Sequence, residues 1–345
     1  MARTPIAVVG AGLIGRTHID RALANGDVEL VGIADPSPEG HRVAQDAGVP
    51  WYASHEAMLD ATSPRGVIVA TPNATHAAIA IACLERGAAV LVEKPVADTL
   101  DDARRLCDVS AATRLPVLVG HQRRHNPIMR RARQMITDGL LGRPVCLTAM
   151  ATWLKPAGYF DARWRREKGG GPILINLIHD IDQLRFLFGD IASVQAATSN
   201  AIRGFEVEDT AVVLLRFRNG ALGTVTVSDT AAAPWTWDLS SGEAERFPRQ
   251  DVNSHFISGT EGSLTLPRLE YWHYREAKGW HDELTQQRNA LHFGDVYALQ
   301  LAHFRAVIEG TEVPLCAASD ATRSLEATLA VRDAAKSGQP VQLPA

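Results

Sequence analysis

The chain has 345 residues, of which 46% are hydrophobic and 21% charged, and its formal net charge is −4. This composition is ordinary for a globular protein and excludes a disordered or collagen-like chain. The slightly acidic balance does not favour a nucleic-acid partner, and no apolar run approaches the roughly 18 residues that cross a membrane. Because the length exceeds that of one typical core, we expect two domains.

Four cysteines lie far apart without a paired spacing, which predicts neither a disulfide framework nor a zinc site. The residues from Met1 to Pro5 lead into a short apolar run broken by glycine, a pattern unlike a secretory signal. Together these features predict a cytoplasmic protein.

The first 122 residues alternate between short apolar runs and helical patterns. The runs have the length of strands buried on both faces and lie at residues 6–9, 29–34, 66–70, 89–92 and 117–119. The helical patterns lie near residues 13–25, 39–47, 55–61, 74–87 and 99–113. This alternation predicts an α/β domain over residues 1–122, built on a doubly wound parallel sheet.

The remainder, residues 123–345, reads as an α+β domain. Helices are predicted near residues 126–138, 294–309 and 319–336. Strands are predicted at residues 144–154, 191–200, 210–218, 221–229, 253–258 and 262–266. The pairs Asn219-Gly220 and Glu261-Gly262 mark tight turns between strands, which predicts a mainly antiparallel sheet.

A glycine-rich turn follows the first apolar run and opens the first helix. In a dinucleotide-binding turn, the first glycine permits the bend, the second lets the backbone approach a pyrophosphate, and the third lets the helix pack on the strand. The helix N-terminus then offers N–H groups and a positive dipole to phosphates. A tight turn in an unrelated α/β protein is the alternative. We expect NAD or NADP to contact Gly10, Gly12, Leu13, Ile14 and Gly15.

Asp35 closes the second apolar run, twenty residues after Gly15. A carboxylate at this position binds the ribose hydroxyls of the adenosine and repels a 2′-phosphate. It therefore favours NAD over NADP. His41 and Arg42 follow closely and weaken that preference, so NADP stays an alternative.

Two later runs also end in polar residues, at the edge where open parallel sheets bind ligands. Glu93 and Lys94 follow the fourth run, and a lysine there can hold a substrate hydroxyl; an exposed surface lysine is the alternative. The segment after the third run either caps a helix or lines the cofactor cleft. Its candidate residues are Thr71, Pro72, Asn73 and His76.

A run of three glycines at residues 169–171 leads into an apolar helical pattern with three polar residues, Asn176, His179 and Asp182. Each is three residues from the next, so neighbouring pairs are predicted to share a helix face. Histidine titrates near neutral pH and can act as a general base, whereas a buried core histidine is the alternative. The spacing of His179 and Asp182 also fits a metal pair, but the sequence places no third ligand, so we expect no metal.

Residues 123–168 carry eleven Lys and Arg against three acids, a net charge of +8. This window suits an anionic substrate, and solvated helix faces are the alternative. Four tryptophans either stack on a sugar ring or fill the core: Trp153, Trp164, Trp235 and Trp237.

The order of these motifs resembles the glucose–fructose oxidoreductase/inositol dehydrogenase (Gfo/Idh/MocA) family along essentially the whole chain. The resemblance rests on the glycine-rich turn, Asp35, the segment 71–76, Glu93-Lys94-Pro95, Arg124 before Asn126-Pro127, and the segment 169–182. It implies a Rossmann domain over residues 1–122 and a substrate-binding and oligomerisation domain over residues 123–345. The second domain would carry a large open sheet that packs face to face in homodimers or homotetramers.

The resemblance also implies reversible hydride transfer between a sugar or cyclitol and NAD(P), with Lys94 and His179 as catalytic residues. Many members of the family carry an aspartate four residues before that histidine, where this chain has Ile175. Either the neighbouring Asn176 takes over a substrate contact, or the substrate differs from an inositol. Arg124, Trp164 and Asp182 are further candidates for substrate binding.

We therefore predict a dehydrogenase that oxidises a secondary alcohol of a sugar, cyclitol or related polyhydroxylated ring. His179 would accept the hydroxyl proton and Lys94 would stabilise the developing charge on oxygen. The alternatives are a dehydrogenase of a cyclic dihydrodiol or a carboxylated carbinol, an enzyme that recycles its NAD internally, and a non-catalytic NAD-binding sensor. A sensor would not need Lys94 or His179.

Overall fold

The computed structural model describes residues 2–344, and the chain divides into two compact units. The first unit runs to His125 and also takes in Asp295–Leu325, while the second holds Asn126–Gly294 and the chain from Glu326. The division after His125 lies close to the expected boundary at residue 122. The segment 295–325, which we expected in the second domain, packs with the first unit instead.

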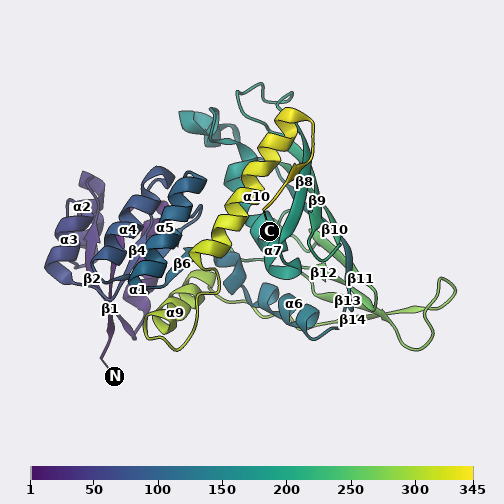
Figure 1. Ribbon diagram of the computed structural model, residues 1–345, viewed down its shortest axis with the longest axis horizontal. Helices are drawn as coiled ribbons and strands as arrows, with labels where there is room; N and C mark the ends of the chain where they lie inside the picture. The colour runs from purple at the N-terminus through teal and green to yellow at the C-terminus, as the bar shows by residue number, and fades with distance from the viewer. Residues whose placement is uncertain (1, 345) are drawn as a thin grey trace. The chain divides into compact units, whose positions relative to one another are not determined.

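A six-stranded parallel sheet forms the centre of the first unit, in the order β3-β2-β1-β4-β5-β6 (Figure 1). The order reverses between β1 and β4, which creates the switch point where doubly wound sheets bind ligands. This sheet confirms the predicted Rossmann architecture. Its strands are β1 (Thr4–Val9), β2 (Val28–Ala34), β3 (Trp51–Tyr52), β4 (Gly66–Val69), β5 (Ala89–Glu93) and β6 (Val117–Gly120).

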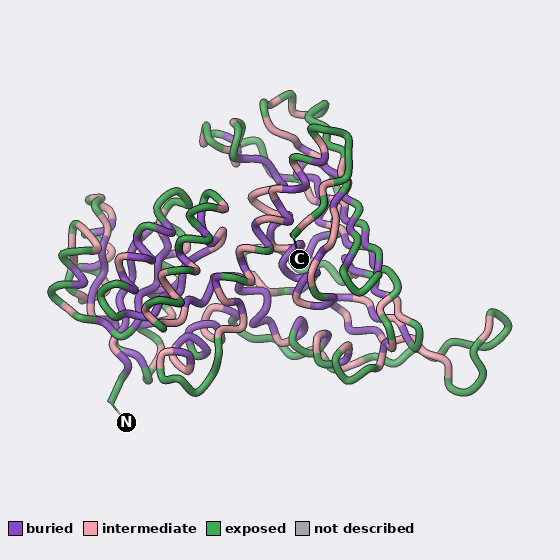
Figure 2. Tube along the Cα trace, viewed as in Figure 1, coloured by how far each residue is buried: buried purple, intermediate pink, exposed green. Residues whose placement is uncertain are grey.

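Helices cover this sheet, so its strands are mostly apolar. Every residue of β4, β5 and β6 is buried (Figure 2). Side chains of Ser37, Ser54 and Thr99 accept hydrogen bonds from the first turns of α2, α3 and α5 and so fix where these helices begin. The helices are α1 (Leu13–Ala24), α2 (Pro38–Asp46), α3 (His55–Thr62), α4 (His76–Glu85) and α5 (Leu100–Thr113), with 3₁₀ turns η1 (Asn73–Thr75) and η2 (Gln122–His125).

Helix α9 (Val296–Ile308) belongs to the first unit because it completes that unit's core. Leu301 and Phe304 are buried in the same apolar cluster as Ile6 and Ile68 of the sheet. A Cβ atom at Gly66 would lie 3.1 Å from the Phe304 ring, so the helix packs directly on β4. The sequence showed α9 as a helix but not which core it fills.

The second unit is built on a nine-stranded sheet in the order β14-β13-β12-β11-β7-β10-β9-β8-β15. All neighbours are antiparallel except β7 and β10, which confirms the predicted mainly antiparallel sheet. The strands are β7 (Pro144–Thr152), β8 (Ile191–Ser199), β9 (Thr210–Phe217), β10 (Leu222–Ser228), β11 (His255–Gly259), β12 (Gly262–Leu266), β13 (Glu270–Tyr274), β14 (Leu284–Arg288) and β15 (Val341–Gln342).

Helices pack on one face of this sheet and leave the other face open. In β9, Ala211, Val213 and Leu215 are buried, while the alternate residues Val212 and Leu214 are exposed. Among residues 2–344, no helix combines the length and apolarity needed to cross a bilayer. The helical segments of this part are α6 (Pro127–Thr137), η3 (Ala157–Asp161), η4 (Arg163–Arg165), η5 (Ile173–Leu177), α7 (Ile178–Phe188), α8 (Trp237–Ser240) and α10 (Ala318–Ser337), which begins in the first unit.

Replacing Phe304 with alanine should lower the free energy of unfolding by about 3–5 kcal/mol, because a buried phenyl ring leaves a cavity. Leu299 lies on the same helix but is 40% exposed, so Leu299→Ala is the matched control. It should cost about 0.5 kcal/mol. Urea unfolding of both variants measures the difference, and equal losses would contradict the packing of α9 in this core.

Candidate active site

The turn between β1 and α1 is shaped by three glycines with different surroundings. Gly10 has φ +94°, and a Cβ atom there would lie 2.5 Å from the carbonyl oxygen of Ala70. A Cβ atom at Gly15 would lie 2.0 Å from the carbonyl oxygen of Gly10. At Gly12, a Cβ atom would meet nothing within 4 Å. The fold therefore requires Gly10 and Gly15, whereas Gly12 borders open space.

This open space lies at the N-terminus of α1. Gly12 is the N-cap residue, and no side chain caps the helix there. Leu13 is 77% exposed and Ile14 is half-buried, so both lie at the surface of the turn. Uncapped N–H groups beside a residue without a side chain form a cradle that fits the pyrophosphate of a dinucleotide.

The Asp35 carboxylate is fixed at the end of β2, next to this turn. Its Oδ2 accepts a hydrogen bond from Ala11 N at 2.7 Å, and its Oδ1 accepts from the backbone and hydroxyl of Ser37 at 2.8 and 2.5 Å. Burial raises the pKa of the Asp35 carboxyl, but these hydrogen bonds and the charge of Arg16 outweigh burial and hold the pKa below its usual value. The charged form is therefore oriented for ribose hydroxyls.

The arginines near Asp35 form ion pairs with another acid, Glu39. Arg16 and Arg42 both form ion pairs with Glu39 on α2. The ring of His41 packs against that of Trp51, with centroids 4.7 Å apart. The single Glu39 carboxylate offsets part of the positive charge of Arg16 and Arg42, which could otherwise attract a 2′-phosphate.

Glu93 ends β5 as a buried carboxylate. Its Oε1 accepts a hydrogen bond from His18 Nε2 at 2.9 Å, and its Oε2 accepts from Lys94 N at 3.3 Å. Burial raises the pKa of the Glu93 carboxyl, but the hydrogen bond and charge of His18 and the charges of Lys94 and His76 outweigh burial and lower the pKa. A Cβ atom at Gly120 would lie 2.9 Å from this carboxyl group, so β6 leaves it just enough room.

His76 joins the two polar segments that follow β4 and β5. Its Nδ1 lies 2.7 Å from the carbonyl oxygen of Pro95, and its Nε2 lies 2.8 Å from that of Thr71. The ring is buried, so these contacts fix the backbone beside the half-buried Lys94. Pro72 and Asn73 continue this loop into η1. His76 therefore positions Lys94 through the backbone.

Arg124 lies in η2 with its guanidinium group buried. Its Nη1 donates to the carbonyl oxygen of Leu315 at 3.0 Å, and the side chain forms an ion pair with Asp320. Both partners belong to the first unit, so Arg124 holds the start of α10 there. The backbone of Val119 likewise donates to Cys316 O at 2.8 Å.

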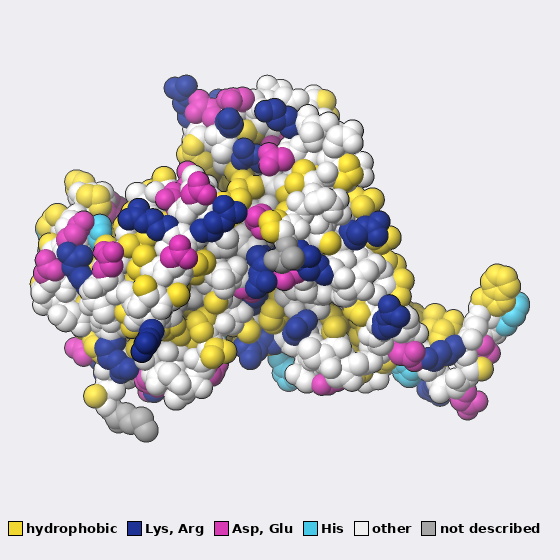
Figure 3. All heavy atoms as spheres, viewed as in Figure 1, with side chains coloured by type: hydrophobic (Ala, Val, Ile, Leu, Met, Phe, Trp, Pro, Cys, Tyr) yellow, Lys and Arg dark blue, Asp and Glu magenta, His cyan; other side chains and the backbone are white. Residues whose placement is uncertain are grey.

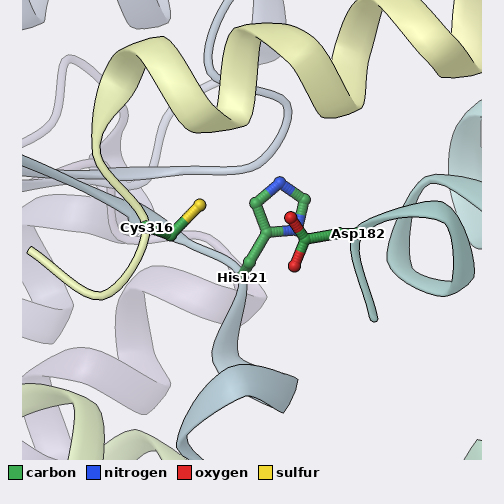
Figure 4. A group of neighbouring side chains, drawn as sticks. All are labelled: His121, Asp182 and Cys316. Carbon is green, nitrogen blue, oxygen red and sulfur yellow. The ribbon is translucent and has the colours of Figure 1, made fainter. Parts of the chain in front are cut away.

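His121 and Cys316 are neighbours in this part of the first unit (Figure 4). His121 follows β6, and Cys316 precedes α10. The third residue labelled in Figure 4, Asp182, comes from α7 in the second unit. No sequence motif marked His121 as a candidate site residue.

In the second unit, the predicted helix after the three glycines has two parts. Residues Ile173–Leu177 form a π-helix, and α7 continues from Ile178. The carboxylate of Glu208 accepts a hydrogen bond from Ile173 N at 3.0 Å, and a Cβ atom at Gly171 would lie 2.5 Å from that carboxylate. Because Asn176 lies in the π-helix and His179 in α7, the predicted common face does not follow from α-helical spacing.

His179 is half-buried, and Asp182 is buried. Neither lines the cavity of about 610 Å³ in this unit, whose walls include Gly169, Gly170, Glu208 and Arg332.

Lys155 belongs to this region too, although its sequence pattern did not mark it as a site candidate. Its Nζ donates to Asn176 Oδ1 at 2.6 Å and lies 3.9 Å from Asp229 Oδ2. Burial lowers the pKa of Lys155 to about 8, against the opposing charges of Asp229 and Asp238. Its position directly after a strand and before Pro156 was the available signal, hidden among many basic residues.

The basic window 123–168 is largely engaged by internal contacts. Arg163 pairs with Glu167, and Arg133 donates to the carbonyl oxygen of Leu187 at 2.9 Å. On the face shown in Figure 3, basic and acidic side chains are interspersed. Trp237 is fully buried, whereas Trp164 is 54% exposed and available to a ligand.

Fold and glycine-rich turn together define a dinucleotide-binding protein. A family model described as an oxidoreductase family with an NAD-binding Rossmann fold matches residues 4–121, and the GFO/IDH/MocA C-terminal domain matches residues 129–265. The scyllo-inositol 2-dehydrogenase (NAD(+)) of Bacillus subtilis is 28% identical over 98% of this chain and 95% of its own length. The 1,5-anhydro-D-fructose reductase of Ensifer adhaerens is 30% identical over 97% of each chain.

A solved structure supports the same family. The WlbA dehydrogenase from Bordetella pertussis, crystallised with NADH and UDP-GlcNAcA, aligns with a TM-score of 0.79 at 25% identity over 99% of each chain. The chain belongs to the GFO/IDH/MocA family of oxidoreductases. It is an NAD-binding oxidoreductase, which confirms the predicted family, enzyme class and cofactor.

Gly12→Ala should leave the fold stable, because the added methyl group meets no protein atom within 4 Å. It should weaken NAD binding by about tenfold or more, since the methyl group occupies the space of the pyrophosphate. Gly15→Ala is the contrasting variant, and overpacking against Gly10 should cost it about 1–3 kcal/mol of stability. Thermal unfolding and NAD titration measure both effects. Unchanged NAD affinity in Gly12→Ala would contradict the placement of the dinucleotide.

Proposed function

We propose that this protein oxidises a secondary alcohol of a sugar, cyclitol or related polyhydroxylated ring, using NAD. The observation that carries the proposal is the complete dinucleotide cradle, with an open Gly12 and an oriented Asp35 carboxylate, in a chain that also carries Lys94 and His179. The names of relatives such as the scyllo-inositol dehydrogenase support the substrate class.

The catalytic roles in this proposal are as follows. His179 accepts the proton of the substrate hydroxyl, since an imidazole exchanges protons near neutral pH. Lys94 donates a hydrogen bond to the same oxygen and stabilises its negative charge. Bound NAD supplies the hydride acceptor.

Two further residues contribute to substrate binding in this proposal. Asn176 stands beside Ile175, where many family members carry an aspartate, and its amide is held by Lys155. Trp164 offers an exposed aromatic surface to a sugar ring. Asp182 is buried and supports α7 near His179.

Lys94→Ala and His179→Ala should each bind NAD normally and lose about 10²-fold or more in kcat, the usual scale for acid–base groups. Lys168→Ala removes an exposed lysine and should keep wild-type turnover. Steady-state NADH formation with the best sugar or cyclitol provides the measurement. If both site variants keep wild-type turnover, the reaction uses other groups and these catalytic roles of Lys94 and His179 are wrong.

Preference for NAD depends on the charge of Asp35 in this proposal. Asp35→Asn keeps the shape of the side chain and removes its repulsion of a 2′-phosphate. The ratio of kcat/KM for NAD to that for NADP should fall by about tenfold or more. A wild-type enzyme that prefers NADP would contradict this role of Asp35.

We also propose that the protein is a homodimer or homotetramer assembled through the open face of the second sheet. Four apolar side chains are exposed on it, at 45–52%: Val212, Leu214, Leu222 and Phe256. An apolar patch of this kind is typical of an association surface. None of the four cysteines forms a disulfide, which supports a cytoplasmic location.

Leu214→Glu should reduce the assembly to a smaller species, because it places a charge in the centre of the apolar face. Val313→Glu is the control, since Val313 is 82% exposed and lies outside this sheet. Light scattering coupled to gel filtration reports the mass of each. A monomeric wild type would contradict the proposed assembly.

A further inference from the structure

We propose that Lys155 is a substrate-binding residue, whose ammonium group donates a hydrogen bond to a hydroxyl oxygen of a neutral polyol. This inference rests on the proposed function and specifies how the second unit recognises its substrate. The residues that carry it, Lys155, Asn176, Asp229, Arg203 and Tyr159, all belong to that unit.

The ammonium group of Lys155 is buried with unused hydrogen-bonding capacity. The side chain is only 5% exposed, yet among residues 2–344 its Nζ donates one hydrogen bond, to Asn176 Oδ1 at 2.6 Å. The Asp229 carboxylate, at 3.9 Å, is too distant for a second hydrogen bond. Two of its three N–H groups therefore lack an acceptor, which is costly in a buried group unless a ligand supplies one.

The backbone and surroundings of Lys155 hold this group in place. Arg203 donates to the carbonyl oxygen of Lys155 at 3.0 Å and to Asp229 Oδ1 at 2.9 Å. The Tyr159 ring lies 4.5 Å from the ammonium nitrogen, and burial raises the pKa of its hydroxyl, which keeps the ring neutral. A rigid ammonium group beside an aromatic ring and an amide is suited to orient a hydroxylated ring.

Asn176 links Lys155 to the candidate catalytic helix. Because an ammonium group can only donate, the amide oxygen of Asn176 must face Lys155, and its Nδ2 must face away. Asn176 precedes His179 by three residues, next to Ile175. The Lys155–Asn176 pair therefore brings hydrogen-bond donors to the segment where an aspartate is absent.

The groups around Lys155 add no net attraction for an acidic substrate. Asp229 and Asp238 stabilise the Lys155 ammonium, while Arg165 and Arg203 oppose it, so two acidic neighbours offset two basic ones. The Asp229 carboxylate lies 3.9 Å from Nζ, and a substrate carboxylate bound there would face it and be repelled. A hydroxyl oxygen accepts the hydrogen bond without that repulsion. Since burial lowers the pKa of Lys155 to about 8, the ammonium form still predominates at pH 7.

The test compares the preferred polyol with its monodeoxy analogues, one for each hydroxyl group, in the wild type and in Lys155→Met. The wild type should discriminate against one analogue by about 30-fold or more in kcat/KM, because that analogue leaves the ammonium unpaired. In Lys155→Met, the kcat/KM values for this analogue and for the parent polyol should lie within about threefold of each other. Calorimetric titration of the polyol into the NADH-bound enzyme should show the same pattern in affinity. Lys168→Met is the matched control and should keep wild-type discrimination.

Each outcome has one meaning. Unaltered discrimination in Lys155→Met overturns the inference and leaves the proposed function intact. A wild type that turns over no polyol overturns the proposed function and this inference with it. A wild-type preference for carboxylated polyols that Lys155→Met abolishes overturns the assignment to a neutral hydroxyl. If Lys155→Met does not fold, Asn176→Ala should weaken the same discrimination, and unchanged discrimination there overturns the inference.

Discussion

The close approach of backbone at the turn between β1 and α1 is the constraint on which the dinucleotide site depends. Gly10 borders the carbonyl group of Ala70 at the end of β4, and Gly15 borders the carbonyl group of Gly10. Because α1 is held against the turn in this way, its uncapped N-terminus faces the carboxyl edge of the sheet. The hydrogen bond from Ala11 N to Asp35 ties the end of β2 to the same turn. The same backbone contacts therefore position both the N-terminus of α1, which would bind the pyrophosphate, and the Asp35 carboxylate, which would bind the ribose.

Each unit also places a buried, oriented charge beside a candidate catalytic residue. In the first unit, Glu93 is held by His18 and contacts the backbone of Lys94, while His76 fixes the loop that follows. In the second unit, Lys155 is held near the segment that leads to His179. Burying such groups costs stability unless partners compensate the charge. The Glu93 carboxylate has hydrogen-bond partners on both oxygens, whereas the Lys155 ammonium donates a single hydrogen bond. A ligand oxygen could therefore accept a further hydrogen bond from Lys155.

The sequence predicted the parallel sheet well because its strands are short apolar runs. It predicted the glycine-rich turn because close backbone contacts require Gly10 and Gly15 there. It did not predict β13 or β14, since these strands at one end of the sheet are polar or half-buried and lack a clear alternation. The π-helix at Ile173–Leu177 depends on Glu208, which is distant in sequence. Arg124 and Lys155 looked alike as basic residues in one window. Only the fold distinguishes a guanidinium paired with Asp320 from an ammonium with unused donors.

The most direct test of the account is NADH formation by the purified protein with NAD and a panel of inositols, aldoses, sugar acids and dihydrodiols. NAD and NADP binding are measured in parallel by thermal shift. We expect NAD binding and turnover of a neutral sugar or cyclitol, with NADH released in proportion to the oxidised product. Tight NAD binding without net NADH formation from any compound would contradict it and favour a sensor or an enzyme that recycles its cofactor internally.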